Sequence, residues 1–108
     1  MSERRGKYNA KKTEVDGRVF DSRAEARRYS ELCLLEKAGE IKRLETQPVY
    51  PIVVNGKKIC TYIADFRYFD SGFSREIIED VKGMKTPVYR LKKKLVEALY
   101  NITITEIT

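Results

Sequence analysis

Three residues in two short segments could do chemistry together. Asp80 and Lys82 are separated by one residue in EDVKG, and Asp65 lies earlier, in YIADF. Side chains alternate along a β-strand, so Asp80 and Lys82 would share a face with Ile78, while Glu79 would point to the other face. By the same alternation, Asp65 would share a core-like face with Ile59, Ile63 and Phe69. If the two segments form a hairpin, Asp65 and Asp80 lie nearly opposite each other and repel unless a cation lies between them.

Glu25 adds a third carboxylate. The helix predicted for residues 22–38 has an apolar stripe of Tyr29, Leu32, Cys33 and Leu35. Glu25 lies at the middle of this stripe, close in direction to Tyr29 and Leu32. An acidic residue at this position should point toward the sheet that the helix covers.

Each of these residues also has an ordinary interpretation. Asp80 and Lys82 could form an exposed ion pair, Asp65 could cap a turn, and Glu25 could be the capping-box partner of Ser22. A helix glutamate, a strand aspartate and a D-x-K motif on the next strand are together better explained by one shared site.

The sequence excludes several kinds of catalysis. It contains no histidine, so Ser-His-Asp and Cys-His hydrolases, HEXXH metalloproteases and nucleases with a histidine base are ruled out. It contains no GxxxxGK[ST] or GxGxxG phosphate loop. Cys33 and Cys60 are isolated from each other and are predicted to be buried thiols. Hydrolytic chemistry would therefore depend on carboxylates, lysine and a metal ion.

Composition favours a polyanionic partner. Lysine and arginine number 22 against 16 acidic residues, which gives a net charge of +6 and a pI near 9.4. Nucleic acid is the leading candidate for this partner. No apolar run is long enough to span a bilayer, and the N-terminal segment lacks the apolar centre of a signal peptide, so we expect a cytoplasmic protein.

The predicted fold class is α/β, with a mixed β-sheet flanked by helices. Residues 1–12 are predicted to be a basic flexible arm and residues 13–108 a single domain. The predicted elements are a β-hairpin turning at Asp16-Gly17, a helix over 22–38, strands over 44–54, 57–69 and 75–82 with turns at Asn55-Gly56 and Asp70 to Gly72, a helix over 86–100, and a closing strand ITITEI. A strand that follows a helix can pair in parallel with the meander through a crossover connection.

The second predicted helix has Thr86 as its N-cap and Pro87 at its first position. Its predicted apolar stripe consists of Val88, Leu91, Leu95 and Leu99. Lys92 would lie at the edge of this stripe and could reach a phosphate, while Arg90, Lys93 and Lys94 would point further outward. A DNA track and a solvated cationic face are equally compatible with these residues.

Segments SRAEARRYSEL, YIADF and EDVKG resemble the three motifs of the PD-(D/E)XK nuclease superfamily, which has a restriction-endonuclease-like αβββαβ core. About nine tenths of the chain is similar to a family of small phage-encoded proteins catalogued as a domain of unknown function and thought to be Holliday-junction-resolvase-like endonucleases. One departure is that Ala64 precedes Asp65 where the superfamily motif has proline.

The resemblance implies a role for each site residue. Asp65, Asp80 and the backbone carbonyl of Val81 would bind Mg²⁺, with Mn²⁺ able to substitute. Glu25, as the helix acid, would bind a second ion or a metal-bound water. Lys82 would be the motif lysine, which orients the attacking water and stabilises developing charge.

The implied function is structure-selective DNA cleavage, with a four-way junction as the preferred substrate and a homodimer as the active form. Either the hairpin at Asp16-Gly17 or the closing strand could pair two copies. Predicted DNA-binding residues are Lys7, Lys11, Lys12, Gln47, Lys85, Lys92 and Lys94. Alternatives are a nicking, flap or general endonuclease of the same fold, or a DNA-binding protein that retains the fold without catalysis.

Overall fold

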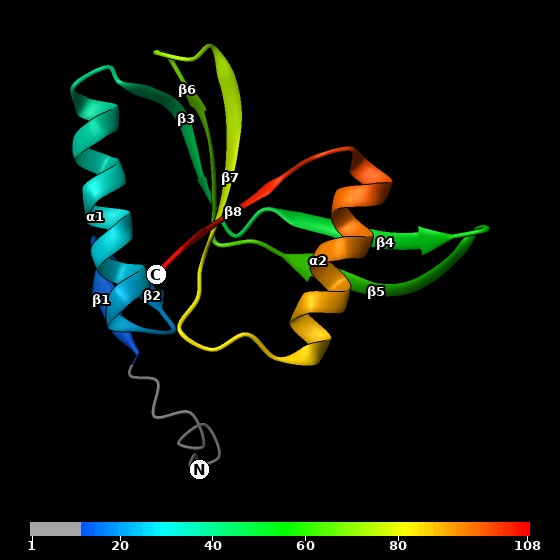
Figure 1. Ribbon diagram of the computed structural model, residues 1–108. Helices are drawn as coiled ribbons and strands as arrows, with labels where there is room; N and C mark the ends of the chain where they lie inside the picture. Colours follow the sequence, from blue (N-terminus) through cyan, green and yellow to red (C-terminus); the bar gives the residue numbers. More distant parts are fainter. Residues whose placement is uncertain (1–11) are drawn as a thin grey trace.

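The computed structural model of the protein describes residues 12–108 and contains two helices and eight strands in that range (Figure 1). In chain order the elements are β1 (Thr13–Val15), β2 (Arg18–Phe20), α1 (Arg23–Lys37), β3 (Ile41–Thr46), β4 (Val49–Val54), β5 (Lys57–Ile63), β6 (Phe66–Asp70), β7 (Arg75–Val81), α2 (Pro87–Tyr100) and β8 (Ile104–Ile107).

Local turn and capping signals are confirmed. Asp16 and Gly17 have φ angles of 51° and 77°, so both adopt the left-handed conformation that a tight two-residue hairpin turn requires. The Ser22 hydroxyl accepts a hydrogen bond of 3.1 Å from the Glu25 amide and begins α1. Thr86 caps α2 in the same way, through the Tyr89 amide.

The central sheet is mixed, as predicted. Its four strands have the order β3-β6-β7-β8, with β8 parallel to β7 and the other neighbours antiparallel. The helix α2 forms the crossover between β7 and β8. β1 and β2 form a separate antiparallel hairpin, and β4 and β5 form a second two-stranded sheet that projects beside α2 (Figure 1). The protein is therefore an α/β protein with an N-terminal hairpin.

The prediction of uninterrupted strands over 44–54 and 57–69 is wrong. The first breaks at Gln47 and Pro48, and the second at Ala64 and Asp65. Two hydrogen bonds cross this break, from the Gln47 amide to the Asp65 carbonyl (2.9 Å) and from the Ala64 amide to the Pro48 carbonyl (3.1 Å). Because Pro48 has no amide hydrogen and Gln47 has a φ of 54°, the regular ladder cannot continue here.

The break changes which side chains are buried. Ile59 and Ile63 were predicted to share a core face with Asp65, but they are 60% and 55% exposed. Tyr62 is buried against α2 instead, whereas Phe66 packs against α1. The face assignment for the strand containing Asp65 is therefore corrected.

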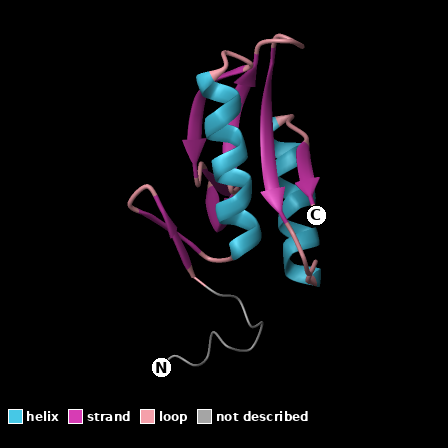
Figure 2. Cartoon of the chain, turned by 90° about the vertical axis from the view of Figure 1, so that its left-hand side faces the viewer, coloured by secondary structure: helices cyan, strands magenta, loops and turns pink. Residues whose placement is uncertain are grey.

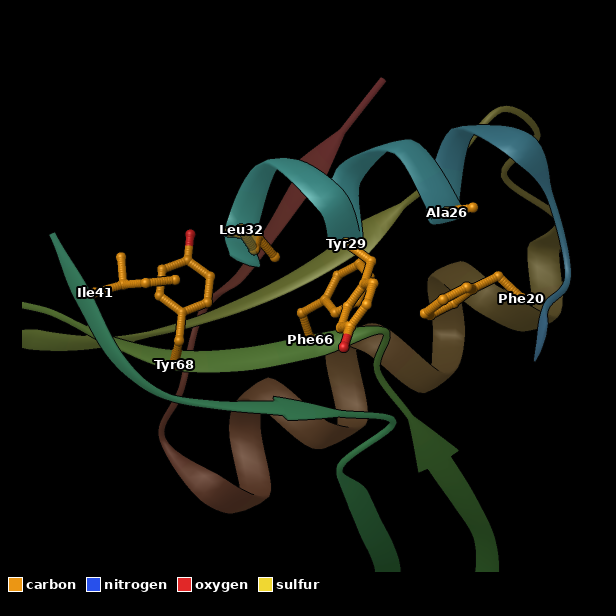
Figure 3. Close-up of a cluster of buried hydrophobic side chains, with 7 residues drawn as sticks. All are labelled: Phe20, Ala26, Tyr29, Leu32, Ile41, Phe66 and Tyr68. Atoms are coloured by element: carbon orange, nitrogen blue, oxygen red, sulfur yellow. The ribbon is translucent and has the colours of Figure 1, made fainter. Parts of the chain in front are cut away.

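The two helices lie on opposite faces of the central sheet (Figure 2), and an apolar cluster packs under each of them. The α1 cluster contains Phe20, Ala26, Tyr29, Leu32, Ile41, Phe66 and Tyr68 (Figure 3). The α2 cluster contains Tyr50, Ile52, Tyr62, Ala64, Ile78, Val96 and Ile104. Along β7, Ile77 and Val81 pack on the α1 side and Ile78 on the α2 side, as the alternation in the sequence predicts.

The predicted apolar stripe of α2 is confirmed only at Leu95, which packs against the α2 cluster, and is wrong at its other three residues. Val88, Leu91 and Leu99 are 64%, 60% and 46% exposed, while Val96 is fully buried and Tyr89 is half-buried. The helix instead presents Tyr89, Leu95 and Val96 to the core, and in this orientation Tyr89 and Lys93 both bond to Glu106 of β8.

Three smaller predictions also need correction. Lys93 lies inward rather than outward, because it bonds to Glu106. Leu35 of α1, predicted to lie on its apolar stripe, is 37% exposed. Cys33 and Cys60 are free thiols, as predicted, but they are only half-buried. None of the helices in the described range is both long and apolar enough to cross a bilayer.

Candidate functional site

Glu25, Asp65, Asp80 and Lys82 come together where the N-terminal end of α1 meets the break before β6 and the end of β7. Asp80 is fully buried and Glu25 is 6% exposed, whereas Asp65 is partly exposed. The charge of Lys82 acts on all three carboxyl groups. The structure thus places all four predicted residues in one cluster.

Hydrogen bonds between the segment before β6 and the end of β7 fix the side chains of Asp65 and Asp80. The register Phe66 to Glu79 brings them opposite one another, as predicted. The Asp65 amide donates to Asp80 Oδ1 (3.0 Å), and the Val81 amide donates to Asp65 Oδ2 (2.7 Å). These bonds take the place of a ladder at the point where regular pairing ends, so both carboxylates have fixed positions.

The side chain of Glu25 is hydrogen bonded to that of Asp65. The backbone amide of Glu25 donates to the Ser22 hydroxyl at the helix N-cap. Its carboxyl group lies toward Asp65 and the sheet, so Glu25 is more than a capping-box partner. Burial, and then the negative charge of Asp65, raise the pKa of Glu25 to about 8. Near neutral pH the two groups therefore share a proton, with Glu25 as donor.

Asp80 is buried beside polar partners. The Tyr62 hydroxyl donates a hydrogen bond to its Oδ2 atom. Burial raises the pKa of Asp80 to about 6, although the nearby charge of Lys82 opposes this shift. Burial likewise raises the pKa of Asp65. Three acidic groups with raised pKa values in one place are typical of a functional site.

Within residues 12–108, no three His, Cys, Asp or Glu side chains are arranged so that together they could hold a metal ion. The reason is visible in the contacts: Glu25 is bonded to Asp65, while Asp80 faces the Tyr62 hydroxyl. The chemistry of the donors nevertheless fits Mg²⁺, which takes oxygen ligands and needs only one or two carboxylates besides water and substrate.

The structure describes five of the seven predicted DNA-binding residues. Lys7 and Lys11 lie outside the described residues. Lys12 pairs with Asp21 (3.0 Å), and Lys85 pairs with Glu106 (3.0 Å).

The other three predicted DNA-binding residues have no ion pair to another described residue. Gln47 is exposed and lies beside Asp65, through the hydrogen bond from its amide to the Asp65 carbonyl. On α2, Lys92 is half-buried and Lys94 is exposed. Gln47, Lys92 and Lys94 therefore remain available to a ligand.

Sequence reasoning missed four residues of the site: Tyr62, Tyr89, Asp21 and Glu106. Asp21 precedes the Ser22 cap, and its charge raises the pKa of both Glu25 and Asp65. Tyr62 and Asp65 both lie in TYIADF, so the motif itself contained a signal for this tyrosine. Glu106 had no such signal, because its contacts depend on how α2 and β8 pack.

A separate open hollow of about 480 Å³ lies along β3 and β6. Its lining includes Arg43, Glu45 and Arg67, and none of the predicted site residues takes part in it. The hollow is therefore distinct from the carboxylate cluster.

The family described as "Protein of unknown function (DUF1064)" matches residues 5–107. The chain belongs to this family. No curated protein and no solved structure matches it. The DUF1064 match spans α1, β6 and β7, so all four clustered residues lie within the family's shared region. Its description carries no activity, and the chemistry of the cluster is the basis for a functional proposal.

The raised pKa of Glu25 predicts how the stability of this DUF1064 protein depends on pH. The folded chain keeps a proton between the ordinary pKa of 4.5 and about 8, whereas the unfolded chain loses it. The resulting stability is fully present below pH 4.5 and is lost as the pH rises through 8. In EDTA, the melting temperature of the wild type should therefore fall more between pH 5 and 8.5 than that of Glu25→Gln.

Thermal melts of the two proteins across this pH range measure the difference. Glu40→Gln, at an exposed position after α1, serves as the matched control and should follow the wild type. Parallel curves for wild type and Glu25→Gln would show that Glu25 is not protonated in the folded state.

Proposed function

We propose that the protein is a metal-dependent DNA endonuclease of the restriction-endonuclease-like PD-(D/E)XK type, with branched DNA as its substrate. The observation that carries this proposal is the convergence of Glu25, Asp65, Asp80 and Lys82, which come from three separate elements. Placing three acidic groups together in a partly buried site is unfavourable without a cation, so a bound divalent cation would explain their placement.

Asp65 and Asp80 are suited to hold a divalent cation, together with the backbone carbonyl of Val81, and Glu25 lies close enough to contribute. A bound Mg²⁺ ion would neutralise charge on a phosphodiester and make hydroxide available near neutral pH. The raised pKa of Glu25 favours its protonated form, so a cation held by Glu25 and Asp65 would displace that proton. Lys82 would stabilise negative charge that develops on the phosphate.

A net charge of +6 supports a polyanionic substrate. The exposed Gln47 beside Asp65 could contact the DNA near the cluster, and Lys92 and Lys94 could contact its backbone from α2. We also propose that the protein acts in the cytoplasm of a bacterial cell infected by a phage, which is the setting that the sequence resemblance implies.

The test is incubation of purified protein with labelled four-way junction, flap, duplex and single-stranded DNA, with Mg²⁺, Mn²⁺ or EDTA. We expect cleavage with either metal and none in EDTA, with the junction cut fastest. Binding of DNA without cleavage under all conditions would instead favour a non-catalytic DNA-binding protein. Equal cleavage of junction and duplex would retain the nuclease and remove the junction preference.

A homodimer belongs to this proposal, because a junction requires two symmetrical cuts. The sheet β4-β5 offers a surface for it on the face away from α2. Val49, Val53, Ile59 and Ile63 are 57%, 44%, 60% and 55% exposed, and Val49 is paired directly with Ile63. Apolar patches of this kind on soluble proteins mark interaction sites.

The exposed stripe of α2 is less suitable for self-association. Val88, Leu91 and Leu99 are bordered by Arg90, Lys92 and Lys94, so two copies would bring like charges together. Residues with charged side chains on β4-β5 are limited to Lys57 and Lys58, next to its turn. The outer face of β4-β5 is therefore the better surface for a second copy.

Ile63→Glu should convert the homodimer to a monomer, because it places a charge in an apolar interface. Leu91→Glu is the matched control, at a similarly exposed apolar position on α2, and should remain dimeric. Sedimentation velocity at micromolar concentration measures both. A monomeric wild type, or a dimer that survives Ile63→Glu, would contradict this interface.

A further inference from the structure

Lys82 is the amine of the carboxylate cluster, yet it is not paired with a carboxylate. None of the ion pairs within 4.0 Å between described residues includes it. Its Nζ atom instead lies over the ring of Tyr89, 4.5 Å from the ring centre. A cation in this position is attracted by the negative face of the aromatic ring.

Tyr89 is itself held at both ends. Its amide donates to the Thr86 hydroxyl at the start of α2 (3.1 Å), and its own hydroxyl donates to Glu106 Oε2 (2.8 Å). The ring lies near that of Tyr62, with 6.4 Å between centres. The side chain is therefore fixed by a helix cap, a neighbouring ring and a strand.

Glu106 is a firm anchor for the tyrosine hydroxyl. Lys85 and Lys93 lie 3.0 and 3.2 Å from its two carboxylate oxygens. The hydrogen bond from Lys85, and then that from Tyr89, lower the pKa of Glu106 to about 2. Glu106 is therefore ionised and available as an acceptor at any pH at which the protein would work.

A lysine beside three carboxyl groups needs such support. Its stem is flexible, and an amine free to move would form an ion pair with the nearest carboxylate, which would neutralise a ligand and withdraw the amine from the substrate. We propose that Tyr89 is a positioning residue, whose ring holds the Lys82 amine at the edge of the carboxylate cluster and leaves it free for a phosphate. The catalytic part of this inference rests on the proposed nuclease function.

A spectroscopic test examines the position of Lys82 without any reference to activity. Reductive methylation with ¹³C-formaldehyde labels the lysine amines and retains their charge. The methyl protons of Lys82 should be shifted upfield by the ring current of Tyr89, and Lys82→Arg identifies their resonance by its disappearance. The shift should persist in Tyr89→Phe, which keeps the ring, and be lost in Tyr89→Leu.

Cleavage kinetics then test the consequence for catalysis. Tyr89→Leu should lower kcat by about tenfold or more, since misplacement of a catalytic group is costly. Its half-saturating Mg²⁺ concentration should stay unchanged, because the carboxylates are intact. Tyr89→Phe should retain kcat within about threefold, because the ring that carries the amine remains.

The outcomes separate the two proposals. Absence of the upfield shift in the wild type would overturn the proposed position of the Lys82 amine over the Tyr89 ring, even if Tyr89→Leu fails to fold. Equal kcat for wild type and Tyr89→Leu, or equal losses for the Phe and Leu variants, would also overturn it. A wild type that shows the shift but cleaves no DNA would overturn the nuclease function, and with it the catalytic part of this inference, while confirming the contact.

Discussion

Asp80→Asn should abolish metal-dependent cleavage of DNA, with a loss of about a thousandfold or more, because a required oxygen ligand loses its charge. The fold should be retained. An asparagine oxygen can still accept the bond of 3.0 Å from the Asp65 amide, and the Tyr62 hydroxyl can accept from the new amide group. Asp65→Asn should give a similar loss.

DNA binding should be unchanged or slightly tighter in both variants. Each substitution removes one negative charge near the phosphates and leaves the cationic residues in place. Cleavage rates and gel-shift affinities for the same junction separate the two effects. Glu76→Gln, at an exposed position on the same strand as Asp80, is the control and should behave as the wild type. Wild-type cleavage by both aspartate variants would refute the site assignment.

Among the substitutions proposed for this protein, Arg28→Met should cause the largest loss of stability. The expected loss is about 3 kcal/mol in the free energy of unfolding, which is typical of breaking a buried ion pair. Arg28 donates two hydrogen bonds, of 2.8 and 2.6 Å, to the carboxylate of Glu79. Glu79 is 1% exposed and also accepts a hydrogen bond from the Tyr68 hydroxyl. Removing the guanidinium leaves this charge buried without its cation.

Urea denaturation measures this loss. Arg27→Met, at the neighbouring exposed position on α1, is the control and should change stability by less than about 0.5 kcal/mol. The double variant Arg28→Met with Glu79→Gln should recover part of the loss, because glutamine is uncharged and still accepts from Tyr68. Similar stability for the two single arginine variants would show that the ion pair contributes little.

The parts of the fold that were predicted correctly depend on short-range signals. Asp16-Gly17 favours a tight turn through the left-handed conformation of two adjacent residues, and Ser22 caps α1 through an amide three residues away. The pairing of Asp65 with Asp80 also follows from local spacing, because the turn after β6 sets the register. These features were accessible because few distant contacts influence them.

The wrong predictions depend on distant contacts. The orientation of α2 depends on contacts with residues outside the helix: Val96 packs in the α2 cluster, and Tyr89 and Lys93 bond to Glu106 of β8. Three exposed aliphatic residues on α2 gave a stronger periodic signal than the face that packs. The strand break at Asp65 has no signal within TYIADF, whose composition is that of a continuous strand. Its cause lies across the ladder, at Gln47 and Pro48.

The site was predicted better than the surface around it. Glu25 and Asp80 are buried acidic residues, which are unusual enough to stand out in a sequence. Asp65 instead follows from its spacing to Asp80, which the strand register reproduces. Exposed lysines give no such contrast, and two of those predicted to bind DNA, Lys12 and Lys85, are engaged in ion pairs.

The break between β5 and β6 also limits how many residues can lie between these two strands. Tyr62 and Ala64 pack with α2, whereas Phe66 and Tyr68, which continue the same even-numbered series, pack with α1. The two-residue repeat therefore changes phase at Asp65, and each half supplies a different core. Inserting or deleting one residue between Ala64 and Phe66 would reverse the alternation in one of the two strands. The aromatic side chains of that strand would then point away from their core, and exposed side chains would point into it. Between these residues, evolution can vary side chains far more readily than it can vary the number of residues.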